Sequence, residues 1–319
     1  MDIQKILSSF ALKKKTPEQM ARVGLDIGVA GVRVLVLSGE KDKPAIMAFS
    51  YVPIENNISE SIKKAISAIH FAVPKVNIGL SGPGVIIRYI NLPKMNKEEL
   101  RGALQFEAEK HIPFSVKEVF LDAYILNELA NNQMFVLLAA VKKELVQQSM
   151  QLMQSVGVEI NNIDINTIAL INTFAYLERQ ASSKPGENTK SSALLDIGLK
   201  FSSLSIIEGQ IPRLSRDISV GTKAFAAGNK DALSANLIDE IRRSFDFYES
   251  QSGKSLEAIY LSGEGSKTEG LEQLLAQSLS LPVKFWDPIS SFNLETKVNK
   301  ELLNLQAHML AVPLGLALR

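Results

Sequence analysis

The segment Val23–Leu37 (VGLDIGVAGVRVLVL) combines a short apolar run with an alternating apolar and polar pattern. This pattern predicts two strands joined by a tight turn, with Asp26 and Gly28 at the bend. A polar turn at residues 38–40 follows and leads into a third candidate strand. The beginning of the chain therefore predicts a unit of three successive strands.

The same pattern returns in the second half of the chain. Ala193–Ile207 (ALLDIGLKFSSLSII) repeats Leu-Asp-Ile-Gly at its bend and again continues through a polar turn toward a third strand. A second pair of segments follows in the same order, Asn77–Gly84 and Ile259–Gly265, and each is a short apolar strand that ends in Ser-Gly-x-Gly. Two matches in the same order predict a duplicated α/β domain.

Apolar residues at helical spacing predict helices between these strands, at residues 59–73, 142–157, 165–178 and 236–250. The segment 85–126 has no counterpart in the second half. It is predicted as strand, helix and strand, with Asn96 and Glu99 in a capping box. We therefore expect a first lobe at 21–180 with an inserted subdomain at about 82–128, and a second lobe at 181–319, which begins with a polar run.

Residues 1–20 are predicted to form a tail outside the lobes. The apolar residues between Ile3 and Phe10 share one helical face, and Lys13–Lys15 follow them. The pattern leaves two interpretations open: a solvated tail, or a peripheral contact with an anionic membrane surface or a partner.

Composition narrows the class of protein. The 35 basic and 34 acidic residues nearly cancel, which argues against nucleic acid as a partner. The absence of cysteine excludes disulfides and thiol catalysis and is typical of a reducing compartment. Apolar runs such as 135–141 are too short to span a bilayer, so we expect a cytoplasmic protein. The histidines, His70, His111 and His308, have no metal-ligand spacing.

The two Asp-x-Gly turns are the best candidates for chemistry. Backbone N–H groups of such a turn can bind a phosphate, and an aspartate at the strand end can hold Mg²⁺. Two turns that face each other could bind a polyphosphate from both sides. The same residues are also ordinary hairpin chemistry, so a purely structural role stays open at this point.

This arrangement resembles the actin-like ATPase superfamily, in which each half offers a phosphate hairpin. Three segments, Leu92–Met95, Glu98–Leu100 and Phe106–Phe114 (FEAEKHIPF), are similar to PilM-like proteins of type IV pilus assembly. Two more, Asp239–Ser250 and Ile259–Leu271, resemble that family's second-half helix and adenosine turn. The resemblance implies an α/β, actin-like (ribonuclease H-like) duplicated two-lobed fold with a small strand-helix-strand subdomain in the first lobe and a reduced second-lobe subdomain.

The family also implies partners and a cofactor. PilM-like proteins lie at the inner face of the cytoplasmic membrane, work with other pilus-assembly proteins, and bind the cytoplasmic N-terminal tail of a PilN-like inner-membrane protein. That tail lies between the first-lobe core and the inserted subdomain, so 85–92 and 96–111 are its expected walls; no individual contact residue is predicted. The family typically binds ATP and Mg²⁺, which by resemblance assigns Mg²⁺ to Asp26 and Asp196. The implied nucleotide and phosphate contacts are Asp26, Gly28, Arg33, Asp196, Gly198, Ser202, Ser203, Gly263 and Gly265.

Several positions depart from the family pattern. In the first hairpin, Val29–Gly31 and Arg33 stand where the family usually has serines and then a lysine. Glu264 stands where the adenosine turn usually has glycine, and the segment 222–236 is too short for the helical subdomain that walls the adenine. We therefore expect an adaptor with a degraded nucleotide site and no catalytic residue. Two alternatives stay open: an ATPase whose nucleotide state switches partner binding, and a related secretion-system protein.

Overall fold

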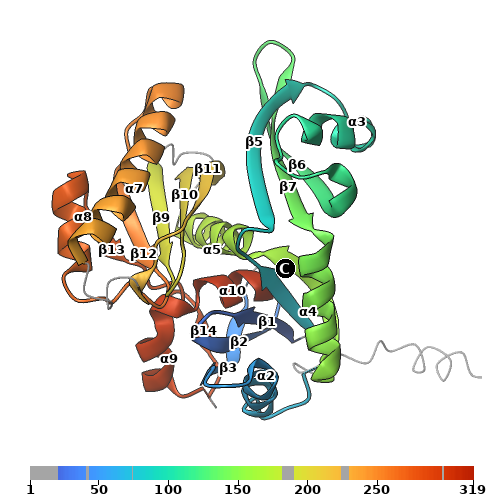
Figure 1. Ribbon diagram of the computed structural model, residues 1–319. Helices are drawn as coiled ribbons and strands as arrows, with labels where there is room; N and C mark the ends of the chain where they lie inside the picture. The colour runs from blue at the N-terminus through green and yellow to red at the C-terminus, as the bar shows by residue number, and fades with distance from the viewer. Residues whose placement is uncertain (1–20, 41–42, 74, 182–189, 224–229, 297) are drawn as a thin grey trace, which may run out of the picture.

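A computed structural model describes residues 21–40, 43–73, 75–181, 190–223, 230–296 and 298–319. The chain forms two lobes, each built on a sheet, and a third small sheet projects from the first lobe (Figure 1). The predicted α/β class and two-lobed plan are confirmed. The expected N-terminal tail lies outside the described residues.

The sheet of the first lobe contains β1 (Arg22–Ile27), β2 (Gly31–Ser38), β3 (Ala45–Pro53), β4 (Val76–Leu80), β8 (Ile160–Ile165) and β14 (Asn293–Leu294). The strands follow the order β14-β3-β2-β1-β4-β8. The first predicted hairpin is β1 with β2, and its antiparallel register places Asp26 opposite Arg33. Because cross-strand partners point to the same face, these two side chains are neighbours.

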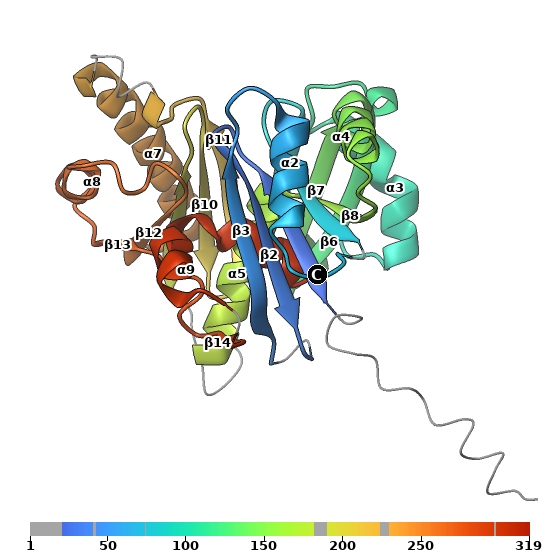
Figure 2. The ribbon, with the colours of Figure 1, turned by 90° about the horizontal axis from the view of Figure 1, so that it is seen from below.

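The helices that cover this sheet are α2 (Ile58–Ser67), α4 (Lys143–Ser155), α5 (Asn166–Ala181) and α10 (Ala311–Ala317). Strand β2 is buried on both faces. Val34 and its alternate neighbours pack toward α2 and α4, whereas Leu35 and Leu37 pack toward α10. Figure 2 shows α2 in front of the sheet and α5 and α10 behind it. Burial on both faces explains why β2 is rich in valine and leucine.

The inserted subdomain contains β5 (Val85–Pro93), α3 (Lys97–Glu109), the short helix η2 (Val116–Glu118), β6 (Val119–Leu129) and β7 (Gln133–Lys142). Its sheet has the order β5-β7-β6, and α3 packs on one face through Leu100 and Ala108. The capping box of Asn96 and Glu99 is confirmed. Strand β7 places the end of the subdomain beyond the expected limit near residue 128. As the central strand it is covered on both faces, so its apolar run lacks the alternation that marks a half-buried strand.

The second lobe contains β9 (Ser191–Ile197), β10 (Ser202–Glu208), β11 (Ile211–Ile218), α7 (Lys230–Ser252), β12 (Ala258–Ser262), α8 (Leu271–Leu279) and β13 (Val283–Phe285). Its sheet has the order β11-β10-β9-β12-β13, which repeats the first lobe's plan. The second predicted hairpin is β9 with β10. Helix α7 begins at Lys230, before the expected start at residue 236, so little chain remains after Gly221 for a further subdomain.

The C-terminal segment returns to the first lobe, which corrects the expectation that all of 181–319 forms the second. Its helix α9 (Lys300–Gln306) and the short helix η3 (Ala307–Met309) precede α10, and β14 pairs with β3. Leu303 and Leu314 are buried in the same cluster as Leu35 and Ile46. These residues are buried against strands that lie far away in the sequence. No local sequence pattern therefore indicates to which lobe the C-terminal segment belongs.

Helices α5 and α10 lie between the two lobes (Figure 1). Leu170 and Leu316 share one buried cluster with Leu194 and Ile207 of the second-lobe sheet. This apolar contact fixes how the two hairpins face each other. Within the described part of the chain, none of the helices is long and apolar enough to cross a membrane.

Candidate functional site: a cleft between two hairpins

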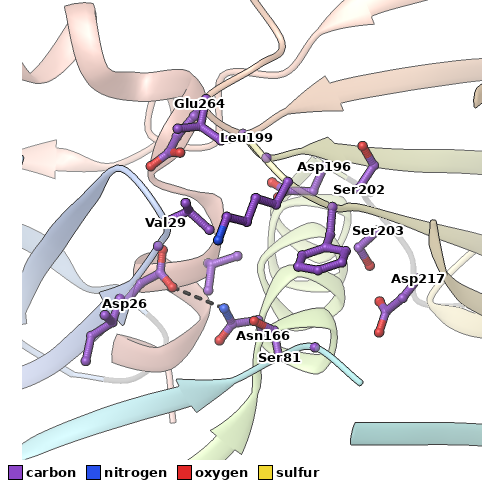
Figure 3. A pocket seen from close by; sticks show the side chains of 18 of the residues that line it. Asp26, Val29, Ser81, Asn166, Asp196, Leu199, Ser202, Ser203, Asp217 and Glu264 are labelled. Atoms are coloured by element: carbon purple, nitrogen blue, oxygen red, sulfur yellow. Dashed lines mark hydrogen bonds between the residues drawn. The ribbon is translucent and has the colours of Figure 1, made fainter. Parts of the chain in front are cut away.

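A cleft of about 470 Å³ lies between the tips of the two hairpins. The first hairpin lines it with Asp26 and Gly28, and the second lines it with Asp196 and Gly198. Figure 3 shows the aspartates on opposite sides of the cleft, with Asn166 of α5 below them. Every residue assigned to nucleotide or phosphate contact by resemblance lines this cleft except Gly265.

Both hairpins close in the same way. The N–H of Gly28 donates to the carbonyl of Gly31 over 2.9 Å, and the N–H of Gly198 donates to the carbonyl of Phe201 over 3.0 Å. The N–H groups of both glycines therefore donate hydrogen bonds within their own turns. The matching bonds are a structural counterpart of the Leu-Asp-Ile-Gly repeat.

Arg33 joins the two lobes across the cleft. Its guanidinium forms ion pairs with Asp26 of its own hairpin and with Glu264 of the second lobe. The three side chains are only 7%, 4% and 9% exposed, respectively. A Cβ at Gly28 would lie 2.8 Å from a terminal nitrogen of Arg33, so this glycine makes room for the guanidinium.

Asp26 has partners for both carboxylate oxygens. Asn166 donates from its amide nitrogen to one oxygen over 3.1 Å, as the dashed line in Figure 3 marks, and Arg33 contacts the other. Asn166 in turn fits beside Gly79, where a Cβ would lie 1.9 Å from its amide oxygen. The first hairpin's carboxylate is therefore already satisfied by protein groups.

The second hairpin also directs its polar groups toward protein partners. Ser262 donates to Asp196 over 2.7 Å, and Ser202 donates to the carbonyl of Val220 over 2.7 Å. The Ser203 hydroxyl lies 3.2 Å from the Thr167 hydroxyl of the first lobe. Burial raises the pKa of the Asp196 carboxyl, while the bond from Ser262 and the charge of Arg33 oppose that shift.

The turn assigned to adenosine by resemblance is held by backbone bonds. Gly263 donates to the carbonyl of His308 and Gly265 donates to the carbonyl of Ile197, each over 2.7 Å. Gly263 has a φ of 92°, and a Cβ there would lie 2.6 Å from the Ile197 carbonyl oxygen. The turn therefore needs glycine at this position for its own geometry.

Sequence reasoning missed several cleft residues. Asn166, Thr167 and Asp217 line the cleft from elements that carry no motif. The pairing of Arg33 with Glu264 was also missed, although a signal existed. Both positions depart from the family pattern, and their charges are opposite.

A groove of about 610 Å³ adjoins the cleft. One wall is β5 of the inserted subdomain, and the facing wall is β11 of the second lobe. The Tyr89 hydroxyl of β5 lies 2.9 Å from the Ser215 hydroxyl of β11, while the Arg216 guanidinium lies 5.7 Å from the centre of the Phe247 ring. Strands β5 and β11 are both edge strands of their sheets.

The groove and the cleft share part of their lining. Ser81, Pro83, Thr167 and Asp217 line both of them. The groove also contains Arg88 of β5 and Arg213 and Arg216 of β11, and Arg213 is paired with Glu208. Its other residues are mostly apolar.

Two lobes of one plan, with a phosphate-type hairpin in each and a cleft between them, define an actin-like protein. A protein of actin-like ATPase fold and unknown function from Bacteroides thetaiotaomicron matches with a TM-score of 0.51 and 12% identity, over 93% of this chain and 98% of that chain. The ethanolamine utilization protein EutJ from Carboxydothermus hydrogenoformans matches with a TM-score of 0.47 and 12% identity, over 93% of this chain and 89% of that chain.

The family described as "Type IV pilus assembly protein PilM" matches residues 24–228 and 231–319. The chain belongs to this family. A solved structure described as the PilM-PilN type IV pilus biogenesis complex matches with a TM-score of 0.81 and 27% identity, over 93% of this chain and 98% of that chain.

Proposed function

We propose that this protein is an adaptor of type IV pilus assembly that works without nucleotide at the inner face of the cytoplasmic membrane. It binds the cytoplasmic N-terminal tail of a PilN-like inner-membrane protein. The observation that carries the nucleotide-free part is Arg33, which holds a carboxylate of each lobe across the place where phosphates would lie. The PilN-like partner is proposed because the similar solved chain belongs to a structure described as a PilM-PilN complex.

The charge of the cleft is unfavourable for a polyphosphate. Carboxylates outnumber cations among the residues that line it. They are Asp26, Asp196, Asp217 and Glu264, against Arg33 and Lys200. The apolar side chains of Val29 and Phe201, which stand at the hairpin tips, are 46% and 45% exposed. A triphosphate would therefore meet an excess of carboxylates over cations and, at the first hairpin, apolar side chains in place of the usual hydroxyls.

The residues do not fit Mg²⁺ either. Both oxygens of Asp26 already contact Arg33 and Asn166. Among the described residues, no group of three or more His, Cys, Asp or Glu side chains could hold a metal ion. A role for Mg²⁺ or ATP therefore forms no part of the proposed function.

An estimate of energies supports the same conclusion. A dissociation constant of about 10 µM corresponds to about 7 kcal/mol of binding free energy. Removing one partner from a buried ion pair costs about 3–5 kcal/mol, and a triphosphate would have to displace Glu264 from Arg33. Binding tighter than about 10 µM would therefore require the other contacts of the triphosphate to supply both amounts.

The groove between β5 and β11 supports tail binding. Its β5 wall lies within the expected wall at 85–92, and the first-lobe core contributes Ile165 and Thr167, whereas no residue of the other expected wall, 96–111, lines this groove. An extended peptide can pair with an exposed strand edge while its alternate side chains enter apolar pockets. Both bordering strands offer such edges.

The test is a titration of Mg·ATP and of a synthetic tail peptide into the wild type and into Asp196→Ala. We expect no ATP binding tighter than about 10 µM in either protein, and tail binding of similar affinity in both. ATP binding tighter than that, abolished by Asp196→Ala, would instead support the ATPase interpretation. Absence of tail binding by the wild type would contradict the adaptor function.

A further inference from the structure

The two walls of the groove touch each other through side chains around Tyr89. The Tyr89 hydroxyl lies 2.9 Å from the Ser215 hydroxyl of β11, and its ring stacks on Phe135 of β7, with the ring centres 6.0 Å apart. The Arg213 guanidinium of β11 lies 5.1 Å from the centre of the Phe135 ring. These four side chains join the inserted subdomain directly to the second lobe, and we call them the strap.

The strap lies on the outer side of the groove. Strand β5 leaves the first-lobe core at Val85, which is buried in one cluster with Leu80 and Ile165. Tyr89 stands four residues later, about 13 Å farther along the strand. Ile165 and Thr167 line the groove on the side of the core. The groove is therefore bordered by the core on one side and by the strap on the other, where β5 rises beside β11 (Figure 1).

Separation of the strap would leave its groups with other partners. The Ser215 hydroxyl has a second partner in the Ser205 hydroxyl, 3.1 Å away, and Arg213 keeps its ion pair with Glu208. Burial raises the pKa of the Tyr89 hydroxyl, and separation would return this hydroxyl to water. The apolar cluster around α5 and α10 would instead expose buried surface. The strap therefore separates more readily than this cluster does.

The connections of the inserted subdomain allow its outer part to move. The subdomain is joined to the first lobe at two points, the turn at 81–84 and the junction of β7 with α4. In the turn, Gly82 has a φ of 97°, and a Cβ there would meet no atom within 4 Å. A loop residue of this kind can absorb the backbone rotation of a hinge. Because the Tyr89 ring is stacked on Phe135, it would move together with the subdomain.

We propose that the strap gates the groove. It holds the groove closed in the free protein, and the partner's tail enters when the inserted subdomain moves away from the second lobe. This inference rests on the proposed function, because that function places the tail in the groove. The tail then binds with an affinity that is lowered by the predominance of the closed form.

The first experiment measures the affinity of a synthetic tail peptide for the full chain by calorimetric titration. Tyr89→Phe removes the strap hydroxyl and keeps the ring that stacks on Phe135. We expect this variant to bind the peptide about two- to tenfold tighter than the wild type does, because one hydrogen bond fewer opposes opening. Tyr124→Phe, at an exposed tyrosine of β6, is the control and should bind like the wild type. Equal or weaker binding by Tyr89→Phe would overturn the inference.

The second experiment measures the opening itself. The chain has no cysteine, so spin labels can be attached at Ala130→Cys, in the hairpin of the subdomain, and at Glu249→Cys, on α7. Both positions are exposed. Double electron–electron resonance should give a longer distance between the labels when the peptide is bound. In the free protein, Tyr89→Phe should broaden the distribution toward that longer distance.

The outcomes separate the strap from the proposed function. A distance that stays the same when the peptide is bound contradicts the gate and leaves the adaptor function intact. Absence of peptide binding by every variant contradicts the proposed function itself. In that case an unchanged distance distribution in free Tyr89→Phe would show that the strap does not hold the groove closed either.

Discussion

Arg33 lies between carboxylates of both lobes, and its surroundings show how two sequence changes act together. A lysine at this position would have a compact charge free to meet a phosphate, whereas the planar guanidinium of arginine can bind two carboxylates at once. Glu264 supplies the second carboxylate from the far side of the cleft. Each change is visible in the sequence, but their pairing depends on residues 231 positions apart and could be found only in the fold.

The first prediction concerns the stability of this ion-pair group. Arg33→Met should lower the free energy of unfolding by about 3–5 kcal/mol, because it leaves Asp26 and Glu264 buried without a cation. Denaturant unfolding followed by circular dichroism measures the change. Arg101→Met, at an exposed arginine of α3, is the control and should change stability by less than about 0.5 kcal/mol. Equal effects of the two substitutions would show that the Arg33 pairs contribute nothing.

The second prediction concerns the stability of the protein at acid pH. Burial and the charges of Lys267 and Arg33 lower the pKa of His308 from 6.5 to about 4. The folded protein therefore binds this proton less readily than the unfolded chain does. The stability that His308 contributes is present above about pH 6.5 and is lost as pH falls toward about 4. In melting curves across this range, His308→Gln should lose less stability than the wild type. His70→Gln, at an exposed position, should follow the wild type, and an unchanged slope in His308→Gln would refute the assignment.

At the scale of elements, features that depend on neighbouring residues were predicted from the sequence. Features that depend on residues far apart in the chain were not. The two hairpins and the α3 capping box were predicted from short motifs, because turn and cap geometry depends on neighbouring residues. The end of the inserted subdomain was misplaced because β7 is buried on both faces and shows no alternation. The return of the C-terminal segment to the first lobe depends on β14 pairing with β3, which no local pattern predicts.

The third prediction belongs to α3. Asn96 accepts hydrogen bonds from the N–H groups of Glu98 and Glu99, and the Glu99 carboxylate accepts one from the Asn96 N–H. Asn96→Ala should therefore destabilise this helix by about 1 kcal/mol. Hydrogen exchange should speed up in the first turn of α3 and not in α7. Asn56→Ala, an exposed position outside a cap, is the control. Unchanged exchange in α3 would mean that packing on the inserted sheet alone holds the helix.

At the scale of the whole molecule, polar and apolar contacts join the two lobes on either side of the cleft. The lobes meet through Arg33 with Glu264, through Thr167 with Ser203, and by way of the inserted subdomain through Tyr89 with Ser215. The apolar cluster around α5 and α10 lies behind these polar contacts. These contacts hold the two walls of the groove in place. The duplication predicted the two lobes, whereas the contacts between them come from residues outside the repeated motifs.

The most direct test of the account is the affinity of the full chain for the partner's tail peptide, measured by calorimetric titration with and without millimolar Mg·ATP. The account predicts the same dissociation constant in both conditions, because the protein's own side chains hold the lobes together. A dissociation constant that changes about tenfold or more on addition of Mg·ATP, which is about 1.4 kcal/mol of coupling between the sites, would contradict it.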